Sequence, residues 1–330
     1  MGGKAIKNSE RVSRETLFNY AKVIIPKVAK AFNTEVIMVD GFHDKQDFGD
    51  LDLLVLDTGY QDRREILEEH FKPDEIFINS HIISFNYNEL QVDLIFTPIE
   101  NWETSQIFFN WGDLGNFMGK LVNNYGKLRD HGYSIKYGFD GLKCRILYEN
   151  RYKNIYLTKD NSEVFDFLGL DFNQWEKGFN DIEEVFEYII GSKYFDSSSF
   201  QWENLNSRNR ERNKRRPNYI EFLEYIKNHE RAINWVDDTD IYLNELEDFF
   251  GVDLINEFSN LCHEVERDKI IKSKFNGNII MERFPDLKGK ALGESINGFK
   301  SMYSDWETYA YYSKAEKILK EFNNYMDKYV

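Results

Sequence analysis

The sequence predicts an α+β fold, with a mixed β-sheet and its helices in the first half and an all-α second half. Three observations support this prediction. β-rich segments alternate with helical periodicity up to residue 158, helical periodicity continues alone after it, and two apolar strands carry carboxylates near residues 50 and 93. The 330 residues are enough for two or three domains, which we expect at 1–158, 159–235 and 236–330.

The first predicted elements are a long helix and two strands. Apolar residues recur at helical spacing over residues 12–32, where Ser13 marks the N-terminal boundary and Pro26 is expected to kink or divide the helix. Strands are expected next at 34–39 and from Asp50 onward, followed by a helix at 63–71.

Residues 76–87 are β-rich and are expected to form a strand that turns back into a strand containing Asp93. Residues 102–125 have a helical pattern, in which Gly112, Gly115 and Gly119 allow a backbone or a ligand to approach closely. Further strands are predicted over 133–158, with a tight turn at Asp140-Gly141.

The second half has helical periodicity and no convincing strand. The predicted helical segments are 163–168, 182–190, 219–226, 241–250, 254–271 and 306–329. Residues 204–218 are expected to form a long surface loop, which makes 159–235 a helical domain with a basic loop.

Cysteine usage and charge narrow the class of protein. Two distant cysteines, Cys144 and Cys262, predict a reducing compartment without a disulfide framework. The sequence has no signal-peptide core and no bilayer-spanning run, so we expect a cytoplasmic protein with no membrane partner and no obligate protein partner. The net charge of −15 argues against broad, non-specific nucleic-acid binding but is compatible with a local basic groove.

Three carboxylates give the strongest functional signal. Asp50 and Asp52 fall on the same face of a strand, because alternate side chains share a face, and Asp93 stands within the apolar run Val92–Phe96. Carboxylates held close together on a buried sheet repel one another and are costly to desolvate, and a divalent cation removes both penalties. A solvent-facing role at a turn or strand edge explains one such aspartate more readily than three.

Gly41, the Asp50-Leu51-Asp52 strand and the later Asp93 strand resemble the nucleotidyltransferase superfamily of DNA polymerase β, tRNA CCA-adding enzymes and poly(A) polymerases. Its signature is an apolar strand ending in Gly-Gly or Gly-Ser, then Asp-x-Asp, then an acidic residue on a following strand. The resemblance covers residues 34–98. It implies a nucleotidyltransferase-type mixed sheet and makes 1–158 the catalytic domain.

The resemblance also implies a chemistry. Asp50, Asp52 and Asp93 are expected to hold two Mg²⁺ or Mn²⁺ ions between a nucleoside triphosphate, such as ATP, and an acceptor hydroxyl, whose proton Asp93 could accept. Gly41 and Phe42 stand where the family holds the triphosphate, although the family usually has Ser or Gly at the second position. Lys120 could reach the triphosphate from the helix after the Asp93 strand. The alternative is a solvent-facing lysine.

Two further segments are candidate nucleic-acid contacts. The basic run is expected either to be a solvated, flexible loop or to grip the phosphates of an RNA or DNA acceptor, and its members are Arg208, Arg210, Arg212, Lys214, Arg215 and Arg216. Residues 275–293 are similar to the glycine-punctuated helical tail of CCA-adding enzymes and bacterial poly(A) polymerases. A helix that opens at Gly289-Lys290 suits a backbone phosphate, so Lys290 joins the candidate contacts.

The preferred hypothesis is transfer of a nucleotide to a polynucleotide 3′ hydroxyl, with release of pyrophosphate. RNA is the expected acceptor, in tRNA or poly(A)-type tailing. Two alternatives stay open. The acceptor could be a small-molecule or protein hydroxyl, which the acidic net charge fits slightly better, or the protein could be a catalytically idle nucleotide-binding scaffold, for which Phe42 is the main support.

Overall fold

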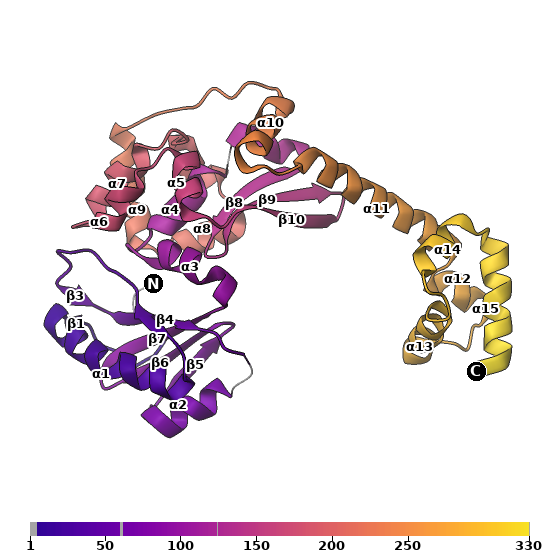
Figure 1. Cartoon of the computed structure of the whole chain (residues 1–330), viewed down its shortest axis with the longest axis horizontal. Coiled ribbons are helices and arrows are strands. Elements are labelled where there is room, and N and C mark those ends of the chain that lie inside the picture. The colour runs from indigo at the N-terminus through magenta and orange to yellow at the C-terminus, as the bar shows by residue number, and fades with distance from the viewer. Residues whose placement is uncertain (1–4, 60–61, 124, 330) are drawn as a thin grey trace. The chain divides into compact units, whose positions relative to one another are not determined.

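The computed structural model describes residues 5–59, 62–123 and 125–329 (Figure 1). The chain is mixed α/β, with a mixed sheet and a helical C-terminal half. It forms two compact units, one of residues 1–146 and 154–252 and the other of residues 147–153 and 253–330. This division does not coincide with the predicted boundaries at 158 and 235.

The larger unit is built around a five-stranded sheet with the strand order β2-β4-β7-β6-β5. The strands are β2 (Val36–Met38), β4 (Asp50–Leu56), β5 (Ile76–Asn79), β6 (Ile82–Tyr87) and β7 (Leu90–Thr97). β4 and β7 are parallel, and the other neighbours are antiparallel. Residues 76–87 are therefore a hairpin rather than one strand, and Ser80 supplies the positive φ of 58° at its turn.

Helices α1 (Arg14–Phe32) and α2 (Arg63–Phe71) pack their apolar residues against one face of this sheet. Ser13 caps α1 as predicted, because its side chain accepts a hydrogen bond from the Thr16 N–H. Of the two expected effects of Pro26, a kink or a division, the division does not occur, because α1 continues through Pro26 as one helix. Ile24 and Val28 are fully buried on either side of it, and their packing offsets the backbone hydrogen bond that proline removes. Two short strands pair antiparallel with each other: β1 (Val12–Ser13), which directly precedes α1, and β3 (Asp47–Phe48), which lies between β2 and β4 in the chain.

On the opposite face, Trp102 packs against Leu54 and Ile95. The predicted helix over 102–125 is two helices, α3 (Trp102–Phe109) and α4 (Leu114–Leu121). Between them, Trp111 and Gly112 adopt φ values of 60° and 67°, which a right-handed helix cannot continue through.

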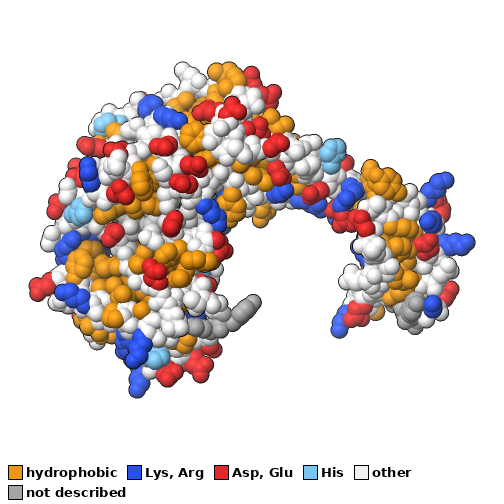
Figure 2. All heavy atoms as spheres, viewed as in Figure 1, with side chains coloured by type: hydrophobic (Ala, Val, Ile, Leu, Met, Phe, Trp, Pro, Cys, Tyr) orange, Lys and Arg blue, Asp and Glu red, His pale blue; other side chains and the backbone are white. Residues whose placement is uncertain are grey.

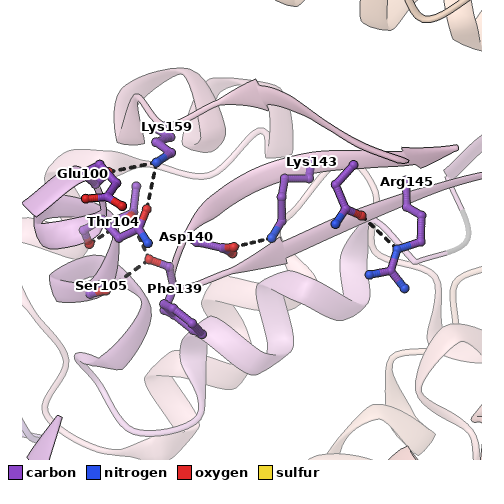
Figure 3. Close-up of polar contacts among 10 residues, drawn as sticks. Glu100, Thr104, Ser105, Phe139, Asp140, Lys143, Arg145 and Lys159 are labelled. Atoms are coloured by element: carbon purple, nitrogen blue, oxygen red, sulfur yellow. Dashed lines mark hydrogen bonds and ion pairs between the residues drawn. The ribbon is translucent and has the colours of Figure 1, made fainter. Parts of the chain in front are cut away.

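A second, antiparallel sheet contains β8 (Tyr133–Gly138), β9 (Gly141–Tyr148) and β10 (Arg151–Thr158). The predicted tight hairpin is present, but Gly138 pairs with Gly141, so the turn lies at Phe139-Asp140, one residue before the predicted Asp140-Gly141. Figure 3 shows how α3 holds this turn: the Phe139 carbonyl accepts hydrogen bonds from the hydroxyls of Thr104 at 2.7 Å and Ser105 at 3.1 Å.

The remaining helices of the larger unit are α5 (Asn161–Leu168), α6 (Phe172–Lys177), α7 (Ile182–Ile190), α8 (Ser207–Asn213), α9 (Pro217–Tyr225) and α10 (Thr239–Phe250). The expected surface loop at 204–218 is wrong, because it contains α8 and the start of α9. Asn206 caps α8 by accepting a hydrogen bond from the Asn209 N–H, and Asn213 at its end is buried.

The smaller unit joins the tip of the β9–β10 hairpin to α11 (Leu254–Lys274) through ion pairs, among them Arg151–Asp268 and Lys153–Glu257. Four further helices follow: α12 (Gly277–Arg283), α13 (Gly289–Lys300), α14 (Trp306–Tyr312) and α15 (Ala315–Tyr329). Their core is aromatic, with Phe275, Phe299 and Phe322 all buried.

As predicted, the described residues after 158 contain no strand. None of the described helices combines the length and apolar character that crossing a membrane requires. Acidic side chains are scattered among hydrophobic and basic ones on the face shown in Figure 2.

Candidate metal centre and surrounding residues

Asp50, Asp52 and Asp93 meet on one face of the five-stranded sheet. Asp50 and Asp52 are the first and third residues of β4, and Asp52 pairs in register with Asp93 on the parallel strand β7. One carboxylate oxygen from each residue lies within 4.8 Å of the other two. Two oxygens bound to a single Mg²⁺ lie no more than about 4.2 Å apart, so these oxygens are within about 0.6 Å of a spacing that one ion can bridge.

The alternation of β4 explains this placement. Leu51, Leu53 and Val55 are buried in the core beneath α1, which leaves Asp50 and Asp52 on the other face. That face turns apolar further along the strand, where Leu54 contacts the cluster around Trp102. The core on one side therefore fixes the strand that presents the carboxylates on the other.

The carboxylates of Asp52 and Asp93 are poorly stabilised as anions. Burial, followed by the charges of Asp50 and Asp93, raises the pKa of Asp52 well above its usual range. Burial also raises the pKa of Asp93 to about 6, and Asp50 adds to the shift, although hydrogen bonds from Ser84 and Gln91 oppose it. Oxygen ligands at this spacing, with unfavourable mutual repulsion, could hold a hard divalent cation.

Gln91 and Ser84 support the site and were not predicted from the sequence. The Gln91 amide nitrogen donates to both carboxylate oxygens of Asp93, at 2.9 and 3.0 Å. Its carbonyl oxygen accepts from the N–H groups of Ala5 and Ile6, at 3.0 and 3.1 Å. Gln91 stands two residues before Asp93, and this spacing places both side chains on one face of the strand. The spacing is the feature of the sequence that could have identified Gln91 as a partner of Asp93.

The turn at Gly41-Phe42 is held by other parts of the larger unit. The Arg14 guanidinium donates to the carbonyls of Phe42 at 3.2 Å, His43 at 2.7 Å and Lys45 at 3.1 Å. The N–H groups of His43 and Asp44 donate to the carbonyls of Phe179 and Asn180, at 2.9 and 3.0 Å. These two amides are therefore already engaged and do not face an incoming phosphate.

Phe42 packs against the turn between α3 and α4. A Cβ atom added at Gly112 would lie 3.1 Å from the Phe42 ring. Beside this contact, the Trp111 N–H donates to the Asp40 carbonyl at 3.0 Å. The aromatic side chain at position 42 thus has a packing role in this fold.

Lys120 is not a solvent-facing lysine. Its side chain is buried, and it lines a pocket that Asp50, Asp52 and Asp93 do not line. Burial, followed by the charges of Arg212, Arg129 and Arg216, lowers the pKa of Lys120 to about 8.

The basic run lies on and just after α8, and part of it is engaged within the chain. Arg216 forms a largely buried ion pair with Asp113, and Lys214 pairs with Glu211 at 3.0 Å. Arg212 donates to the Asn116 side-chain oxygen at 3.0 Å. The remaining members are Arg208, Arg210 and Arg215, of which Arg208 and Arg215 are exposed. Lys290 is the second residue of α13 in the smaller unit, and its side chain is 89% exposed beside Glu294.

No protein-family model matches the chain, and no curated protein matches its sequence. What the site offers chemically is a cluster of three oxygen ligands on two parallel strands, with one of the carboxylates fixed by Gln91.

Proposed function

We propose that this protein is a divalent-metal-dependent nucleotidyltransferase that transfers a nucleotide from a nucleoside triphosphate to the 3′ hydroxyl of an RNA. The observation that supports the proposal is the convergence of Asp50, Asp52 and Asp93, with oxygens within 4.8 Å of one another on adjacent parallel strands. Two-metal phosphoryl-transfer sites use carboxylates held in this way.

The residues have distinct parts in this proposal. Asp50 and Asp52 hold the cations from one strand, and Asp93 shares them from the next. Bound divalent cations supply charge neutralisation on the phosphates and lower the pKa of the acceptor hydroxyl. Gln91 holds both oxygens of Asp93, so this carboxylate stays oriented for metal contact or for accepting a proton.

Incorporation of labelled nucleotide tests the proposal. Each of the four nucleoside triphosphates is incubated with the protein and Mg²⁺ in three arms: total RNA, single-stranded DNA, and no acceptor. We expect incorporation into RNA that Asp52→Asn abolishes. Asp44→Asn is the matched control, because Asp44 is an exposed acid near the same strand and does not belong to the triad. Equal incorporation by the wild type and Asp52→Asn would contradict the proposal.

One observation favours a second candidate, a protein that keeps the fold without turnover. The amides of His43 and Asp44 are engaged by Phe179 and Asn180, so the turn lacks two donors that could otherwise hold a triphosphate. In that case Mg²⁺ binds to the triad, and no labelled nucleotide is incorporated with RNA, with single-stranded DNA or without an acceptor. Both candidates bind Mg²⁺ at the triad, so calorimetric titration of Mg²⁺ into the wild type and Asp52→Asn tests the shared metal site, and incorporation into RNA by the wild type separates the two candidates.

A further inference from the structure

Lys120 is a buried charge that the proposed transfer chemistry does not use. Its side chain is 8% exposed, and its Nζ atom has no hydrogen-bond partner among the residues that the structure describes. A buried ammonium without an acceptor is strongly unfavourable, which is why buried charges are normally paired. With a pKa lowered to about 8 by burial and by the charges of neighbouring arginines, Lys120 is still mostly charged at neutral pH.

The pocket around Lys120 is lined by cations and amides. It has a volume of about 240 Å³ and lies between α4, β8 and the start of α8. Its cationic lining residues are Lys120, Arg129, Lys136 and Arg212. Its amide lining residues are Asn116, Asn123, Asn204, Asn206 and Asn209. No Asp or Glu is among the described lining residues, although acidic residues outnumber basic ones by 57 to 42 in the chain.

Cations on the neighbouring sheet show the contrast (Figure 3). Lys143 pairs with Asp140, and Lys159 donates to the Glu100 carbonyl at 3.0 Å. Arg145 donates to the Asn154 side chain at 2.9 Å. These side chains have hydrogen-bond acceptors, whereas the Lys120 ammonium at the pocket wall has none within the part of the chain that the structure describes.

We propose that this pocket binds a phosphate group. Guanidinium, ammonium and amide donors without a competing carboxylate match an oxyanion, and charge-assisted hydrogen bonds to phosphate are among the strong ones. The pocket is smaller than the roughly 300–1,000 Å³ that encloses a whole small ligand, so it takes the phosphate moiety alone. Arg129 and Arg212 are exposed, which leaves room for the rest of the ligand to extend into solvent.

Titration of inorganic pyrophosphate into the full-length protein, followed by calorimetry in the presence of a metal chelator, tests this site. We expect binding that Lys120→Met and Arg212→Gln each weaken about ten- to a hundredfold. Arg215→Gln is the matched control, since Arg215 is exposed in the same basic run, three residues on, and does not line the pocket. Arg212 is exposed, so its variant keeps the test valid even if Lys120→Met folds poorly.

Asp52→Asn separates this inference from the proposed function, because pyrophosphate binding under chelation is expected to survive that change. Absence of binding by the wild type overturns the pocket, as does equal affinity in the wild type, Lys120→Met and Arg212→Gln. Loss of binding in Asp52→Asn alone also overturns it, because the anion then depends on the carboxylate site.

The source of the phosphate is identified with two further probes under the same conditions, ATP and a single-stranded RNA with or without a 5′ phosphate. Lys120-dependent binding of ATP alone assigns the pocket to a polyphosphate. Lys120-dependent binding of the 5′-hydroxyl RNA assigns it to the RNA backbone, and a requirement for the 5′ phosphate assigns it to the RNA end. If Lys120→Met binds ATP and the RNA as tightly as the wild type does, the proposal is overturned.

Discussion

Replacing Asp93 with asparagine should stabilise the metal-free protein. Asp93 is 8% exposed, and its pKa is raised from 3.8 to about 6, chiefly by burial. A shift of about two units corresponds to roughly 3 kcal/mol of unfavourable free energy for the ionised carboxylate. Asparagine removes that charge but turns an N–H₂ group toward Gln91, and this mismatch costs about 1 kcal/mol. The expected net gain is about 2 kcal/mol at pH 7.5.

The gain has a defined pH dependence. Between pH 3.8 and about 6, the folded wild type binds more protons at Asp93 than the unfolded chain does. Its stability therefore falls as pH rises through this window, and the full penalty is present above it. The asparagine variant lacks this term, so its advantage should shrink as pH falls below 6 and, near pH 4, give way to a small deficit from the mismatch with Gln91.

Thermal and urea unfolding in chelator provides the measurement, with Asp44→Asn as the control. A gain of about 2 kcal/mol corresponds to a rise in Tm of roughly 4–8 °C for a unit of this size. Adding Mg²⁺ should stabilise the wild type and leave Asp93→Asn nearly unchanged, because only the intact triad binds the ion well. The reasoning is refuted if Asp93→Asn is no more stable than the wild type at pH 7.5 without metal.

Three further predictions concern residues outside the triad. Gln91→Leu removes both hydrogen bonds to Asp93 and should raise the Mg²⁺ concentration needed for nucleotide incorporation by about 10–100-fold, as a Mg²⁺ titration of activity would show. The stability of the wild type in urea, relative to that of Lys120→Met, should rise by up to roughly 3 kcal/mol between about pH 8 and 10.5, because folded Lys120 binds fewer protons there than the unfolded chain does. The comparison cancels the opposite contributions of buried tyrosines and of Cys144, whose pKa values are raised. Gly112→Ala should lower the free energy of unfolding in urea more than Gly251→Ala does. Both glycines have a positive φ, but only the new Cβ at position 112 meets the Phe42 ring. Equal losses of stability in the two variants would rule out that contact.

The shared face of Asp50 and Asp52 could be predicted from the sequence, because side-chain alternation is a local property of a strand. The turn of the chain into the Asp93 strand could be predicted for the same reason. The pairing of Asp52 with Asp93 is different, since β4 and β7 are parallel neighbours separated by two other strands and a helix in the chain. Sequence pattern alone does not fix such a register.

The surroundings of Lys120 could not be predicted from the sequence. Its burial depends on α8, which begins more than 80 residues later, where the charge run favoured a flexible loop. The cap at Asn206 and the burial of Asn213 turn that segment into a helix, and Arg212 then reaches Asn116 on α4. Charge composition describes the solvation of a segment but not which other element it packs against.

The larger unit thus carries two sites of opposite charge, the carboxylate triad and the buried Lys120 ammonium, and none of the triad residues lines the Lys120 pocket. A chain selected for stability alone gains by pairing such groups or replacing them with apolar side chains. Each is instead held by a rigid element, β4 and β7 for the carboxylates and α4 for the lysine. Under the two proposals, a divalent cation would neutralise the first site and a phosphate group would neutralise the second.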